Sequence, residues 1–236
     1  MILKEFLFVC AVSSRTYAYL QALKEIDVFP KMCYILAESK EECEIQRVHS
    51  DKDNTYFRID TNLITLLEKY GIPYQILHTK DANSDQVYEA LKGEKSAYVI
   101  YSGYGGCILK QRLFMLGKKI IHVHAGLLPE YRGSTTVYYS ILKDRCVGAT
   151  GIFMNEKIDE GDIILEKSFD LPEADVDIDY VYEPWARGQV LAEIVKRYIE
   201  DGRLEGVRQK SGGETYFIIH PVLKHLAVLS VKENII

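Results

Sequence analysis

The chain has 236 residues, of which 47% are hydrophobic and 27% are charged, and its formal net charge is −5 at pH 7. This length suits one sizeable α/β domain with a small appendage, and the composition is ordinary for a soluble globular protein. A net negative charge without a basic stripe disfavours a nucleic-acid substrate, so small metabolites are the expected partners.

The sequence carries no targeting signal that we recognise. No apolar run approaches the roughly 20 residues needed to span a bilayer. The first apolar stretch contains Glu5 and ends at Ser13-Ser14-Arg15, so it indicates a core strand and not a signal peptide. The five cysteines lack metal-ligand spacing, and their odd number disfavours a disulfide framework. We therefore expect a cytoplasmic protein with no membrane partner.

Strand and helix patterns alternate along the first half of the chain. Strands are predicted at 6–12, 32–37, 74–77, 97–101 and in the apolar segment with His122 and His124, and helices near 16–26, 61–70, 85–91 and 109–116. This alternation predicts an α/β fold, a Rossmann-like doubly wound sheet that is mostly parallel and has helices on both faces. The polar residues 38–56 predict a surface excursion after the second strand.

The second half contains fewer elements. Apolar segments at 150–154 and 163–165 flank a turn with Asp159, and a long helix is predicted at 180–201, ended by Gly202. The glycines at 212–213 precede a further apolar run, which predicts a hairpin. We expect a catalytic domain at 1–201 and a small C-terminal β-hairpin appendage at 202–236.

Residues 120–133, IIHVHAGLLPEYRG, place more potential chemistry between a strand and a turn than any other stretch. His122 and His124 are two apart on a strand, so they project from the same side, near the end where open α/β sheets bind ligands. Metal ligation would need a third and usually a fourth donor, and the other histidines show no supporting spacing. A structural role for either histidine is the other alternative.

Two segments together resemble the folate-dependent formyltransferase family. LLPEYRG at 127–133 matches the family turn Leu-Leu-Pro-x-Tyr-Arg-Gly, and IDEGDII at 158–164 matches the loop Ile-Asp-x-Gly-Asp-Ile-Ile. The pair in the right order is far more specific than either half. This sequence departs from the family at His122, where the family has Asn, and at Ala125-Gly126, which replaces Pro-Ser.

The resemblance implies that His124 is the acid/base, that Asp159 is its partner, and that His122 takes the place of the Asn that donates to the formyl oxygen. Formyl transfer to an amine needs proton removal from nitrogen near neutral pH, which imidazole suits. The oxyanion of the tetrahedral intermediate needs a donor. His122 can supply an N–H, although with a different reach from an amide. Alternatively, His122 faces another ligand and the backbone donates instead.

The resemblance also implies 10-formyltetrahydrofolate as co-substrate, without a metal. The glycine-containing turn at 101–106 corresponds to the family loop that borders the pterin, although a plain βα turn is the alternative. Neither this turn nor the first one has the Gly-x-Gly-x-x-Gly pattern, which disfavours NAD. The expected cofactor-binding residues, from this turn and the two motifs, are Tyr101, Gly103, Tyr104, Gly105, Leu127 and Asp162.

The acceptor is expected at two sequence features. Ser13, Ser14 and Arg15 lie at the first strand-to-helix turn, where backbone N–H groups and the helix dipole favour an anion, although a simple N-cap explains them as well. Tyr180, Tyr182, Trp185 and Tyr216 can stack on a nucleobase, and helix packing is the equal alternative.

The compact size with a small appendage is most similar to the sugar N-formyltransferases within the resembled family. We therefore expect transfer to the amine of a nucleotide-linked amino-dideoxy sugar, in surface-glycan biosynthesis. Formylation of glycinamide ribonucleotide, or a catalytically inactive folate- or nucleotide-binding relative, is the alternative. The sequence does not fix the oligomeric state, and a homodimer is compatible with it.

Overall fold

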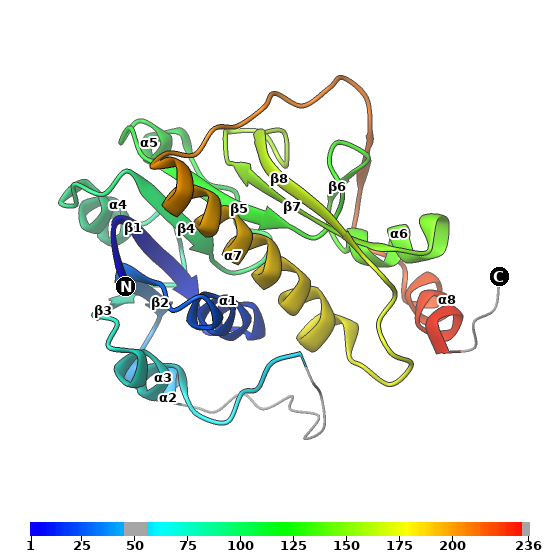
Figure 1. Cartoon of the computed structure of the whole chain (residues 1–236), viewed down its shortest axis with the longest axis horizontal. Helices are drawn as coiled ribbons and strands as arrows, with labels where there is room; N and C mark the ends of the chain where they lie inside the picture. The colour runs from blue at the N-terminus through cyan, green and yellow to red at the C-terminus, as the bar shows by residue number, and fades with distance from the viewer. Residues whose placement is uncertain (45–55, 233–236) are drawn as a thin grey trace.

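The computed structural model describes residues 1–44 and 56–232, and its centre is a seven-stranded sheet with the order β3-β2-β1-β4-β5-β7-β8 (Figure 1). The first five strands are parallel, and β7 and β8 continue the sheet in antiparallel fashion. The prediction of a mostly parallel α/β sheet is confirmed. The strands are β1 (Ile2–Ala11), β2 (Phe29–Ala37), β3 (Tyr74–His78), β4 (Tyr98–Ser102), β5 (Lys119–His124), β7 (Val147–Phe153) and β8 (Asp162–Phe169).

Helices cover both faces of this sheet because its central strand is apolar on both sides. Phe6 and Phe8 of β1 pack with the helices α1 (Ser14–Glu25), α3 (Leu63–Tyr70) and α7 (Glu183–Asp201). Leu7 and Val9 point the other way, toward α4 (Asp85–Lys92) and α5 (Gln111–Phe114). In Figure 1 the blue α1 lies beside α7, and the two helices contact each other along their length.

Local signals set the ends of the helices that matter for the site. The Ser13 hydroxyl accepts from the Thr16 amide at 3.4 Å and so caps α1. One π-helical turn (Ile178–Tyr182) leads into α7, and Gly202 ends α7 with a φ of +71°. The expected end of the long helix is confirmed. Most of the predicted surface excursion falls on residues 45–55, outside the described ranges, and α2 (Lys40–Glu44) is its described part.

The C-terminal segment differs from the predicted hairpin. Its strand β9 (Glu214–Tyr216) pairs in parallel with β6 (Tyr131–Gly133), and a helix, α8 (Pro221–Lys232), follows and packs on α6 (Thr136–Asp144). The small β element is confirmed, but the hairpin is wrong. A β-carbon on Gly133 would lie 2.1 Å from the Tyr216 carbonyl oxygen, so glycine permits the close parallel pairing. Local patterning does not reveal a partner so distant in sequence.

None of the described helices is both long and apolar enough to cross a membrane.

Candidate active site

Two adjoining cavities lie at the carboxyl ends of the central strands, where open α/β sheets bind ligands. The larger, of about 670 Å³, contains both sequence-predicted histidines and Asp159. The second, of about 520 Å³, is lined by the turn that begins α1. Seven residues line both cavities: Arg15, Gly103, Tyr104, Gly105, Asp179, Glu183 and Arg187. Two ligands bound in these cavities would therefore meet each other.

The structure brings His124 and Asp159 together. Nδ1 of His124, at the end of β5, lies 3.4 Å from Oδ2 of Asp159, and both side chains are largely buried. Asp159 has a φ of +53°, a left-handed conformation that Asp tolerates better than most residues. The Gly133 amide donates to the same carboxylate oxygen at 2.9 Å. The turn and the loop of the two motifs therefore meet at this pair of side chains.

The hydrogen bonds of His124 fix its tautomer. Nε2 lies 2.6 Å from the Tyr131 carbonyl oxygen, which only accepts, so Nε2 carries a proton and Nδ1 is a bare acceptor in the neutral ring. Burial lowers the pKa of His124 below its ordinary 6.5, although the Asp159 carboxylate and the Tyr131 carbonyl act in the opposite direction. The His124 imidazole is thus neutral at pH 7, and the Asp159 carboxylate can stabilise its protonated form.

His122 has a different environment from its neighbour. Its Nε2 lies 3.5 Å from Nη2 of Arg187. Its Nδ1 is buried without a hydrogen bond of regular geometry among the described residues, although the Tyr101 backbone lies near enough to favour the protonated ring. Burial holds the pKa of His122 well below 6.5, and the charges of Arg187 and Arg15 lower it further, while the Tyr101 backbone acts against them. His122 is therefore neutral at pH 7.

Four of the six predicted cofactor-binding residues, Tyr101, Gly103, Tyr104 and Gly105, line the larger cavity. A β-carbon on Gly103 would lie 2.2 Å from the Tyr101 hydroxyl, so this turn excludes larger residues there. Leu127 and Asp162 do not line it. Leu127 packs against Gly148, and Asp162 is exposed beside a separate cavity.

Some of the predicted acceptor-binding residues also line a cavity, and others do not. Ser13, Ser14 and Arg15 line the second cavity, and the Arg15 guanidinium donates to the Ser102 hydroxyl at 2.9 Å and to the Gly103 carbonyl. Of the aromatic residues, Tyr180 lines the second cavity, and Tyr182, Trp185 and Tyr216 line neither. Tyr182 and Trp185 pack against each other, and Tyr216 stacks on Tyr131. Their positions favour the packing alternative over nucleobase stacking.

The larger cavity contains one group of donors that a metal ion could use. His122, His124 and Asp159 each offer one atom, and these atoms lie within 4.8 Å of one another. The guanidinium of Arg187 beside His122 places a positive charge next to this group, which disfavours a divalent cation. That no metal takes part stays a prediction.

Sequence reasoning did not identify Arg187, Glu183 and Gln209 as site residues. Glu183 and Arg187 are four apart on α7, with Oε1 and Nη1 at 2.5 Å, a spacing that is common on exposed helix faces. Gln209 donates through Nε2 to the Asp159 and Gly161 carbonyls at 2.7 and 2.8 Å, and its Oε1 accepts from Arg132. A lone glutamine in a loop gives no sequence signal for such a contact.

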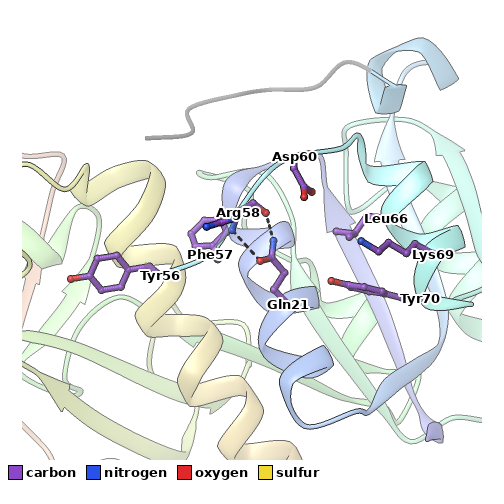
Figure 2. Close-up of a pocket in the computed structure, with 8 residues that line it drawn as sticks. All are labelled: Gln21, Tyr56, Phe57, Arg58, Asp60, Leu66, Lys69 and Tyr70. Atoms are coloured by element: carbon purple, nitrogen blue, oxygen red, sulfur yellow. Dashed lines mark hydrogen bonds between the residues drawn. The ribbon is translucent and has the colours of Figure 1, made fainter. Parts of the chain in front are cut away.

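A further pocket, of about 340 Å³, lies apart from the histidines between α1 and α3 (Figure 2). Figure 2 shows the Gln21 side chain bridging to the Arg58 backbone, whose amide donates to Oε1 at 3.0 Å. None of its lining residues belongs to the predicted site. They are Gln21, Tyr56, Phe57, Arg58, Asp60, Leu66, Lys69 and Tyr70.

Comparisons with known proteins give a family match. A sequence model described as formyl transferase matches residues 4–184. Methionyl-tRNA formyltransferase of Geobacillus sp. (strain WCH70) is 29% identical over 152 residues, which cover 63% of this chain and 46% of that protein. The chain thus spans about half the length of the curated relatives it matches.

Solved structures share the fold at low sequence identity. A sugar N-formyltransferase from Shewanella sp FDAARGOS_354 matches with a TM-score of 0.59 and 16% identity, over 97% of this chain and 88% of that chain. Glycinamide ribonucleotide transformylase 1 from Symbiobacterium toebii matches with a TM-score of 0.57 and 16% identity, over 86% and 92%. Because the family model spans most of the chain and both motifs meet at one cavity, the chain belongs to the formyl transferase family.

Proposed function

We propose that this protein transfers a formyl group from 10-formyltetrahydrofolate to the primary amine of a nucleotide-linked amino sugar. The observation that carries the proposal is the contact between His124 and Asp159 in the larger of two cavities that share part of their lining. One cavity suits the formyl donor and the other the acceptor, so the reacting atoms meet beside a base.

The donor belongs in the larger cavity. Its volume of about 670 Å³ lies within the range typical of small-molecule sites. The turn with Gly103 and Gly105 brings backbone against this space, which lets a flat ring lie close to the main chain. A folate bound there would present its formyl group toward β5.

The proton transfers follow from the tautomer of His124. As the amine attacks the formyl carbon, bare Nδ1 of His124 accepts a proton from the nitrogen, and the Asp159 carboxylate 3.4 Å away stabilises the imidazolium. When the intermediate collapses, the bond from the formyl carbon to the folate N10 breaks. His124 then returns the proton to N10, so the enzyme ends in its starting state.

The acceptor is expected to carry an anionic group. Within the described ranges Arg15 bonds only to the neutral Ser102 and Gly103, while the nearby Glu183 pairs with Arg187. Arg15 thus makes no direct ion pair among the described residues, although the Glu183 carboxylate acts on its charge from a distance, and it lines the second cavity in the first turn of α1. A diphosphate would find both a cation and helix N–H groups there.

Steady-state assays with 10-formyltetrahydrofolate and a panel of amines test the proposal. We expect product with at least one nucleotide-linked amino sugar, at a lower KM than for the same sugar without its nucleotide. Efficient turnover of glycinamide ribonucleotide, with every sugar nucleotide untouched, would replace this acceptor with the alternative. Folate binding by calorimetry without turnover of any amine would instead support an inactive relative.

A further inference from the structure

Arg187 is a buried cation that reaches the site from a helix outside both sequence motifs. Only 6% of its surface is exposed, and it lines both cavities. Its Nη1 is 2.5 Å from Oε1 of Glu183, and its Nη2 is 3.5 Å from Nε2 of His122. The guanidinium is therefore held between a carboxylate on its own helix and an imidazole on β5.

The contact with Arg187 decides what His122 can do. A guanidinium only donates, so Nε2 of His122 is the acceptor and the neutral ring carries its proton on Nδ1. That Nδ1 is buried and not exposed to either cavity. His122 thus presents a lone pair toward the guanidinium and no N–H toward a ligand, so it is poorly placed to replace the amide donor of the family.

The Arg187 guanidinium has more hydrogen-bond donors than its described neighbours use. A guanidinium carries five N–H groups. Nε is buried, Nη1 donates to Glu183 and Nη2 to His122, and Tyr19 also lies against the guanidinium, so at least one N–H of the two Nη atoms remains for a ligand. We propose that Arg187, oriented by Glu183 and His122, donates a hydrogen bond to the formyl oxygen as the tetrahedral intermediate forms. This inference rests on the proposed formyl transfer and assigns a catalytic residue to it.

The electron flow places the new charge on this oxygen. When the amine lone pair forms the C–N bond, the C=O π electrons move to oxygen, and they return when the bond to the folate N10 breaks. The oxyanion exists only between these steps, so a cation there stabilises the transition state more than the substrate. A charged donor bonds an oxyanion more strongly than a neutral amide does.

The charged and titratable groups around Arg187 come from several elements. Glu183 lies on α7, His122 and His124 on β5, Arg15 and Tyr19 on α1, and Asp159 in the loop before β8. Burial opposes the charge of Arg187, but Glu183 and Tyr19 together outweigh burial and the pKa of Arg187 is raised, so the guanidinium stays charged throughout. Arg187 in turn lowers the pKa of His124.

The test compares Arg187→Gln, Arg187→Lys and the double variant His122→Asn/Arg187→Gln, with Arg197→Gln as control on the exposed face of the same helix. We expect Arg187→Gln to lower kcat by about 100- to 1,000-fold with little change in the folate KM. Arg187→Lys should retain part of the activity because it keeps the charge. The double variant should have a higher kcat than Arg187→Gln, because His122→Asn introduces an amide that restores a donor on β5. Arg197→Gln should match wild type.

The pH profile separates catalysis from mere packing. Loss of the Arg187 charge should raise the pKa of His124, so the acid limb of kcat/KM should move to higher pH. Titration of the His124 imidazole by NMR measures the same shift without turnover, and Glu183→Gln should move it in the opposite direction.

Each outcome decides a separate question. A wild-type protein that formylates no amine overturns the proposed function and this inference together. An active wild type beside an Arg187→Gln variant with kcat within about threefold overturns this inference alone. If Arg187→Gln fails to fold, Arg187→Lys tests the proposal in its place. Partial activity of Arg187→Lys supports the proposal. A full loss of kcat together with an unshifted His124 titration contradicts it.

Discussion

Nδ1 of His124 lies 3.4 Å from Oδ2 of Asp159, although one residue ends a central strand and the other lies in a loop before β8. The ring meets a carbonyl at Nε2 and a carboxylate at Nδ1, both of which favour its protonated form. Burial favours the neutral form more strongly. A ring balanced in this way can accept a proton and return it within one turnover.

Replacing His124 with Asn should remove most of the turnover and leave folate binding largely intact. General acid/base groups contribute about 100- to 10,000-fold, and an amide cannot take a proton near pH 7. Single-turnover rates and calorimetric folate affinity measure the two effects separately. Retention of more than about half of the wild-type chemical rate would contradict the assignment of His124 as the base.

Asp159→Asn should lower kcat by about 100-fold, the lower end of what proton-transfer groups contribute. The carboxylate raises the pKa of His124, so its loss lowers that pKa and moves the acid limb of kcat/KM to lower pH. Glu156→Gln is the matched control, because Glu156 is an exposed carboxylate in the same loop. An unchanged rate and profile in Asp159→Asn would show that the contact has no catalytic role.

Arg15→Ala should raise the KM for the anionic acceptor much more than the KM for the folate. The Arg15 guanidinium lines the second cavity and makes no direct ion pair among the described residues. It also fixes the Gly103 carbonyl, so we expect a small effect on folate as well. Lys24→Ala, an exposed cation in the last turn of α1, serves as control. Equal changes in both KM values would contradict anion binding at this turn.

Gln209→Ala should lower kcat without changing either KM, because Gln209 bonds the backbone on both sides of the Asp159 loop. Loss of these bonds should also reduce the free energy of unfolding by about 1 to 2 kcal/mol. Urea unfolding and initial rates measure the two effects, with Gln75→Ala on the exposed face of β3 as control. A stability loss with unchanged kcat would assign Gln209 a purely structural role.

Stability should fall as the pH falls below about 6.5, the ordinary pKa of both active-site histidines. Their folded pKa values are lowered, so the unfolded chain binds more protons in this range and acid favours unfolding. Each histidine contributes a slope of up to about 1.4 kcal/mol per pH unit. His122→Asn should flatten the dependence in urea unfolding between pH 7.5 and 5.5. His225→Asn, which changes an exposed histidine, should not flatten it. Equal slopes in the wild type, His122→Asn and His225→Asn would contradict the buried neutral state of His122.

Much of the fold could be predicted because its signals are local. The apolar runs of β1 and β4, the capping serine at 13 and the glycine at 202 each act within a few residues. The two motifs likewise predicted His124 and Asp159 as a pair. Their contact needed only that a strand end and a nearby loop meet at one edge of the sheet.

Other features depend on partners far apart in sequence. The pairing of β6 with β9 joins segments more than 80 residues apart, and local hydrophobicity does not specify it. The sequence pattern did not indicate Arg187 as a site residue, because an arginine on an amphipathic helix is ordinarily exposed. Its position in the cavity follows from the contact of α7 with β5 and not from its neighbours in the sequence.

The pairing of β6 with β9 also has a consequence for the order in which the protein is made. The parallel sheet consists of residues synthesised early, but the turn beside His124 gains its strand partner only when Tyr216 has left the ribosome. The clamp from Gln209 to the Asp159 loop arrives at nearly the same time. A nascent chain can therefore fold its core while His124 and Asp159 still lack these contacts, so the proposed formyl transfer should be among the last properties acquired during synthesis.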